Sequence, residues 1–93
     1  MDLGPPSLDP TRARVALALA TVALRNTVSF LPMLERQTQR VEVIDLLAEG
    51  FDMLEEDLDK ERFFAIVRRT YWDTTQPASK RALMQTLIGK LDF

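Results

Sequence analysis

The sequence predicts an all-α protein, a small bundle of four to five helices with short connections. Apolar residues recur at steps of three and four along most of the chain, which is the spacing of one face of a helix. No segment has the length and the alternation of apolar and polar residues that a half-buried strand shows. Proline and glycine divide the sequence into pieces of helical length. The 93 residues suffice for one domain with a modest core.

The first helix is expected to begin near "LDPT" and to run to about Phe30. Residues 1–8, with two prolines and a glycine, are predicted to form a flexible arm. Asp9 suits the N-cap and Pro10 the first helical position, where a missing N–H costs nothing. Pro32 is predicted to end or kink this helix.

Large apolar residues lie nearly all around this first helix. They are Val15, Leu17, Leu19, Val22, Leu24 and Val28. A helix without a wide polar face is buried, either within its own domain or against another chain. The sequence leaves these two alternatives open.

A second helical segment is expected over residues 33–49, with Gly50 as its C-cap. Its apolar residues at helical steps are Leu34, Val41, Ile44 and Leu47 or Ala48. Residues 51–59 continue the same spacing. The apolar residues on one side of this continuation are Phe51, Leu54 and Leu58. Whether 33–58 forms one kinked helix or two is left open.

Two further helices are expected in the last third of the chain. Asp59 is predicted to cap a helix that runs to about Trp72. Residues 73–77 have the composition of a turn, and Pro77 opens the last helix. One face of that helix carries Leu83, Leu87, Ile88 and Leu91. Residues 9–93 are therefore predicted to form a single helical-bundle domain.

The commonest general base and the thiol nucleophile of enzymes are missing. The chain has no cysteine and no histidine, which excludes thiolate nucleophiles, Ser–His pairs and typical zinc sites. Its 3 glycines are scattered and cannot build a phosphate-binding loop. Asp57, Asp59 and Glu61 alternate as at the start of an EF-hand loop, but the glycine of its sharp turn is absent. We therefore expect no enzymatic activity, no cofactor, no metal and no small-molecule substrate.

The N-terminal region has some features of a targeting or membrane segment. An uncharged run, "VALALATVAL", lies between Arg14 and Arg25. It is about half as long as a membrane-spanning helix. The acidic residues and prolines before it do not suit the basic start of a signal peptide. We therefore expect a cytoplasmic protein that contacts no membrane.

Charge is unevenly distributed along the chain, although the net charge is only −2. Residues 1–40 carry a balance of +2, residues 41–62 a balance of −7, and residues 63–93 a balance of +3. This polarity suits self-association or docking on a charged partner. The alternative is that the acidic stretch is the solvated face of a surface helix.

The only tryptophan, Trp72, marks the most specific candidate site. At about 100° per residue, the predicted core arc of its helix comprises Phe63, Phe64, Ile66, Val67 and Tyr71. Trp72 lies near 180° from Phe63 and so points away from that arc. Arg68 precedes it by four residues, which allows the guanidinium to lie on the indole.

Three interpretations of Trp72 stay open. Tryptophan with arginine is typical of hot spots in protein interfaces, and also of surfaces that stack a base and bind its phosphate. Alternatively, the indole folds back onto the last helix and only seals the core. The predicted partner-binding residues are Arg68, Arg69, Trp72, Lys80 and Arg81. A second candidate basic surface consists of Arg36 and Arg40.

The segment "YWDTTQPASKRALMQTLIGKLDF" resembles a segment in the C-terminal regions of large serine recombinases. In that family a tryptophan, a turn and a helix of the form "KRALL..LI..I" recur. The similarity covers about a quarter of the chain, and the family's catalytic serine domain is absent from it. The resemblance implies a helix–turn–helix arrangement, and no residue roles are transferred from it.

Together these observations favour a non-catalytic helical protein–protein interaction module that self-associates and serves as a small regulator, an assembly subunit or an adaptor. The alternative is a small subunit of a nucleoprotein complex whose arginines and lysines contact a nucleic-acid backbone. A pI near 5.0 speaks against autonomous nucleic-acid binding. One basic face would suffice for a subunit within a larger complex.

Overall fold

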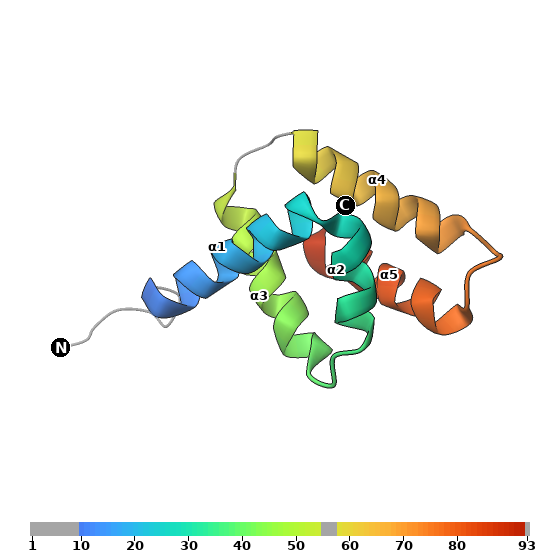
Figure 1. Ribbon diagram of the computed structural model, residues 1–93, viewed down its shortest axis with the longest axis horizontal. Coiled ribbons are helices and arrows are strands. Elements are labelled where there is room, and N and C mark those ends of the chain that lie inside the picture. Colours follow the sequence, from blue (N-terminus) through green and yellow to red (C-terminus); the bar gives the residue numbers. More distant parts are fainter. Residues whose placement is uncertain (1–9, 55–57, 93) are drawn as a thin grey trace.

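The computed structural model describes residues 10–54 and 58–92, and within these ranges the chain forms five α-helices (Figure 1). They are α1 (Pro10–Arg25), α2 (Thr27–Glu35), α3 (Arg40–Met53), α4 (Leu58–Trp72) and α5 (Ala78–Leu91). No strand occurs in these described ranges. The predicted all-α bundle of four to five helices is therefore confirmed. The predicted arm, residues 1–8, and the predicted cap Asp9 lie outside the described residues.

The first predicted helix is in fact two helices, and the break lies at Asn26 rather than at Pro32. Asn26 has φ −132° and ψ 52°, outside helical geometry, and α1 and α2 are bent by 118°. Pro32 lies inside α2. Proline has no N–H, so the carbonyl of Val28, four residues before it, lacks its helical hydrogen bond. Val28 is 78% exposed, so this hydrogen bond is lost on the solvent-exposed side of the helix.

Core packing explains the position of this bend. The chain reverses at Asn26 and thereby turns the apolar face of α2 toward α1 and α3. The buried residues of that face are Thr27, Phe30, Leu31 and Leu34. The predicted break at Pro32 was wrong, because the conformational preference of a single proline carries no information about where the core lies.

α1 packs against α3 through its smallest residues. The buried residues of α1 are Ala16, Ala20, Ala23 and Leu24. Gly50 of α3 faces Ala16 and Ala20. It is buried within the helix, so the prediction that it is the C-cap was wrong. A Cβ atom on Gly50 would lie 2.2 Å from the carbonyl oxygen of Ala16 and 2.8 Å from Cβ of Ala20. The two helices therefore approach to a distance that only glycine permits.

The other side of α1 carries larger apolar residues toward solvent. Val15 is 49% exposed, Val22 50% and Leu17 38%. The sequence left open whether this helix is buried within its own domain or against another chain. Only one side of α1 is buried within its own chain.

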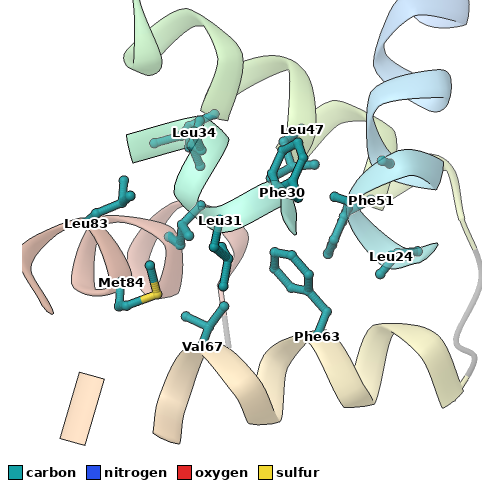
Figure 2. Close-up of a cluster of buried hydrophobic side chains, with 14 residues drawn as sticks. Leu24, Phe30, Leu31, Leu34, Leu47, Phe51, Phe63, Val67, Leu83 and Met84 are labelled. Atoms are coloured by element: carbon teal, nitrogen blue, oxygen red, sulfur yellow. The ribbon is translucent and has the colours of Figure 1, made fainter. Parts of the chain in front are cut away.

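Buried side chains from all five helices meet in one cluster, which Figure 2 shows in close-up. Phe63 of α4 is fully buried, and its ring stands edge-on to Phe51 with centroids 5.1 Å apart and an interplanar angle of 69°. Phe64, Ile66 and Tyr71 are partly buried against this cluster, as the predicted core arc requires.

Two residues that the helical spacing had grouped with the core are exposed instead. Val41 is 60% exposed and Leu58 86% exposed. Val41 lies in the first turn of α3 and Leu58 is the first residue of α4. Both stand at helix ends, where the sequence spacing alone did not reveal which side the neighbouring helices cover.

The first turns of α4 supply donors to the ends of α3 and α1. The Lys60 ammonium donates to the carbonyl oxygens of Phe51 (3.3 Å) and Leu54 (3.2 Å). The Arg62 guanidinium donates to the carbonyl oxygen of Leu24 (2.8 Å). Carbonyls in the last turn of a helix have no partner within that helix. These bonds therefore stabilise two helix ends and fix α4 against them.

The chain between residues 33 and 58 forms neither of the two arrangements that the sequence left open. It contains the end of α2, a linker at 36–39, all of α3 and the start of α4. Asp59 is the second residue of α4 rather than the residue before it, so the predicted cap position was wrong. Asp57, the first of the alternating carboxylates, lies outside the described residues.

The connection between α4 and α5 matches its prediction. α4 ends at Trp72, and Pro77 is the N-cap of α5. Leu83 and Leu87 are buried, and the other two predicted residues of that face are partly buried.

The acidic helix α3 makes ion pairs with both basic ends of the chain. Arg12 Nε donates to the two carboxylate oxygens of Glu49 at 2.9 and 3.1 Å. Lys90 Nζ lies 3.0 Å from Asp45. Some of the charges in the basic and acidic segments of the sequence therefore pair with each other within the fold.

No single helix in the described ranges is both long enough and apolar enough to cross a bilayer. α1 and α2 reach that length only together, and the bend of 118° separates them.

Candidate protein interface around Trp72

Trp72 is displayed to solvent at the end of α4. Its side chain is 74% exposed, so α5 does not cover it. Its ring stands edge-on to that of Tyr71, with centroids 5.0 Å apart and an interplanar angle of 73°. Tyr71 itself packs against the core cluster. The two neighbouring aromatic residues are therefore divided as the helical geometry predicted, one inward and one outward.

The outward face of α4 extends from Trp72 back to the first residue of the helix. Leu58 is 86% exposed, and Ala65 is also exposed. With Trp72 they are spaced seven residues apart, so they form a line along the side of α4 opposite to Phe63 and Val67. Sequence reasoning missed Leu58, because it placed this residue with Phe51 on the core side. Seven-residue spacing from Trp72 is the signal that could have found it.

The predicted arginines border this line. Arg68 and Arg69 are both exposed in the last two turns of α4. At about 100° per residue, Arg68 lies on one edge of the line and Arg69 on the other. The indole of Trp72 is thus bordered by positive charge on both sides. Cations near a helix C-terminus are also stabilised by the helix dipole.

Lys80 and Arg81 lie in the first turns of α5, beyond the turn that follows Trp72 (Figure 1). Both are half-buried. Nε of Arg81 is a buried atom without a hydrogen-bond partner within the described part of the chain. Lys80 and Arg81 are therefore less exposed than Arg68 and Arg69.

Asp73 holds the turn between Trp72 and α5. Its carboxylate accepts hydrogen bonds from the hydroxyl of Thr75 (2.6 Å), the N–H of Thr75 (3.0 Å) and the side-chain amide of Gln76 (3.3 Å). These bonds, those from Thr75 first, lower the pKa of Asp73 below its ordinary value, and the positive charge of Arg81 adds to the effect. The turn fixes the direction in which the chain leaves Trp72.

The second candidate surface is separate from the first. Arg36 is the C-cap of α2 and Arg40 the first residue of α3, and both are exposed. Arg40 borders a shallow depression of about 380 Å³ between α3 and α5. Its other lining residues are Val41, Ile44, Ser79, Ala82, Leu83 and Thr86. Neither Lys80 nor Arg81 lines it, so the structure does not join the two basic surfaces in one depression.

The acidic side chains of the described ranges do not form a metal-binding cluster. Residues 10–54 and 58–92 contain no group of three or more aspartates and glutamates placed to hold a metal ion. What the surface of α4 offers is an aromatic ring, two smaller apolar side chains and flexible charges. These groups suit recognition of another surface.

No protein-family model, no curated protein and no solved structure matches this chain. The resemblance of residues 71–93 to a segment of large serine recombinases thus finds no support from these comparisons.

Proposed function

We propose that this protein is a non-catalytic helical interaction module that binds a protein partner through the outward face of α4. The observation that carries this proposal is the 74% exposure of Trp72 beside two exposed arginines. Tryptophan and arginine are the residue types most enriched in interface hot spots. A tryptophan left in water has a large apolar surface to bury against a partner.

A protein partner is favoured over a nucleic acid by the rest of the same helix face. Leu58 and Ala65 continue the apolar line away from Trp72, and a nucleic-acid backbone offers them nothing to pack on. Glu61 is exposed on the edge that also carries Arg68, and its carboxylate would repel phosphates. The net charge of −2 acts in the same direction.

The proposal is tested by affinity purification of the tagged protein from the cells that produce it, with and without nuclease. Trp72→Ala removes the exposed ring. Val41→Ala is the matched control, because Val41 is an exposed apolar residue on α3. We expect a stoichiometric protein that resists nuclease, is retained by Val41→Ala and is lost with Trp72→Ala. Full retention by Trp72→Ala would contradict the proposal.

The alternative function is a subunit that contacts a nucleic-acid backbone. The position of Arg68 and Arg69 on both edges of Trp72 favours it, since proteins that bind single strands combine aromatic rings, which stack bases, with positive charges, which pair with phosphates. It predicts release of the partner by nuclease and binding that weakens steeply with salt. Binding that is indifferent to salt would exclude it.

A further inference from the structure

The outward face of α4 is complementary to itself. Ala65 lies midway between Leu58 and Trp72, seven residues from each. At a rise of about 1.5 Å per residue, both large residues lie about 10.5 Å from Ala65 along the helix axis, in opposite directions. Two such helices placed antiparallel about a two-fold axis at Ala65 would therefore bring Leu58 of each copy against Trp72 of the other.

The charges along one edge of this face fit the same arrangement. Glu61 lies four residues before Ala65 and Arg68 three residues after it, and both are exposed. In the antiparallel pair, Glu61 of one copy would lie within about 1.5 Å, along the axis, of the level of Arg68 in the other. The two-fold axis repeats this ion pair, so each contact would carry two of them.

From this complementarity we infer that the partner of the α4 face is a second copy of this chain, bound antiparallel about Ala65. This inference rests on the proposed function, because it uses the same surface and names its occupant. The small side chain of Ala65 at the centre allows the two helices to approach closely. α4 lies at the edge of the molecule (Figure 1), and its outward face is opposite to the buried Phe63 and Val67, so no other described helix stands in front of it.

The other edge of the face limits the strength of the dimer. It carries Arg62 and Arg69, which would lie near each other across the pair. Arg62 already lies 3.3 Å from Asp59 and donates to the carbonyl oxygen of Leu24. These two contacts hold its guanidinium against its own chain and weaken its repulsion of Arg69 in the other copy. One face of a single 15-residue helix also buries less area than a standard interface. The dimer is therefore a weak one whose population depends on concentration.

The first experiment measures mass and geometry. Light scattering of the wild-type chain is expected to give a mass that rises from 10.6 kDa toward twice that value with concentration, and Trp72→Ala to remain at the monomer mass. Because the chain contains no cysteine, Ala65→Cys introduces a single thiol at the two-fold axis. We expect it to form a disulfide-linked dimer on mild oxidation, whereas Ala82→Cys on the exposed side of α5 does not.

Leu58→Cys distinguishes the two directions of packing. In the antiparallel pair the two introduced thiols would be about 21 Å apart along the axis, beyond the reach of a disulfide. In a parallel pair they would face each other. Efficient cross-linking of Leu58→Cys would overturn the proposed arrangement.

The second experiment exchanges the charges. Glu61→Arg and Arg68→Glu are each expected to weaken dimerisation at least tenfold, because each creates two like-charge contacts. The double variant Glu61→Arg/Arg68→Glu restores the attraction and is expected to recover most of the wild-type affinity. Asp52→Arg, an exposed charge reversal on α3, is the control and should leave the dimer unchanged. Single reversals that have no effect, or a double variant that recovers nothing, would overturn the inference.

The outcomes separate this inference from the proposed function. A wild-type chain that stays monomeric at every concentration, while a different protein is still captured through Trp72, overturns the self-association and leaves the interaction function standing. Circular dichroism confirms that each variant remains helical. All substituted side chains are exposed, so their replacement is not expected to disturb the fold.

Discussion

Gly50 and Trp72 show how much a single residue depends on its surroundings. Gly50 lies near the end of a predicted helix, where glycine commonly serves as a cap, yet here it is the contact point between two helices. Trp72 is the largest apolar residue of the chain, yet it is 74% exposed. For Gly50 the residue type suggested one role and the packing gave it another, and for Trp72 only the packing decided that the last helix leaves its ring uncovered.

Substituting Gly50 of α3 and Gly89 of α5 should have opposite effects on stability. Gly50→Ala places a Cβ atom 2.2 Å from the carbonyl oxygen of Ala16, so α1 and α3 must separate. We expect a loss of about 1–3 kcal/mol or more in the free energy of unfolding. Gly89→Ala is the matched control, because nothing lies within 4 Å of its added methyl group. It should gain about 0.5–1 kcal/mol from helix propensity.

Urea unfolding of both variants, followed by circular dichroism, tests this prediction. A Gly50→Ala variant as stable as the wild type would show that α1 and α3 do not cross as closely as described.

At the scale of the elements, the two sides of α4 have different roles. The inner side places Phe63 and Val67 in the core. At the start of the helix, Lys60 and Arg62 donate hydrogen bonds to carbonyls at the ends of α3 and α1. The outer side carries the exposed line of Leu58, Ala65 and Trp72. The same helix thus joins the bundle together and presents the candidate interface.

Removing the capping donors should destabilise the ends of α1 and α3. Lys60→Met and Arg62→Met keep most of the aliphatic side chain but remove the bonds to the carbonyls of Phe51, Leu54 and Leu24. We expect each to cost about 1 kcal/mol. Arg14→Met, at a position of α1 outside the core cluster, should stay within about 0.5 kcal/mol of the wild type.

Amide hydrogen exchange locates the effect. Lys60→Met should increase exchange in the last turn of α3, and Arg62→Met in the last turn of α1. Equal changes across all helices would mean that the two side chains act on global packing rather than as caps.

At the scale of the whole molecule, one cluster of buried side chains drawn from all five helices holds the fold together. A domain of this size is stable by about 5–15 kcal/mol, so the loss of one central side chain consumes a large share of that margin. The surface features are independent of this cluster, since Trp72 and Leu58 lie outside it.

The two aromatic residues Phe63 and Trp72 should therefore separate stability from binding. Phe63→Ala is expected to lower the free energy of unfolding by about 3–5 kcal/mol, because the ring is fully buried against Phe51. Trp72→Ala should change it by no more than about 0.5 kcal/mol. Thermal unfolding at a concentration where the chain is monomeric provides the comparison. A large loss for Trp72→Ala would mean that the indole supports the fold rather than an interface.

The sequence by itself determined the fold class, the end of α4, the extent of α5 and the positions of Tyr71 inside and Trp72 outside the predicted core arc. These features depend on the spacing of apolar residues within each helix and on the turn that Asp73 and Pro77 form. Residues close together in the sequence are enough to specify both. Only the tertiary structure decided where α1 bends, what Gly50 contacts and that Leu58 is exposed. Each of these depends on which helix lies opposite, and that information is spread over residues far apart in the chain. The helical period reveals that one side of a helix is apolar, but the partner that covers it is set by the packing of the whole molecule.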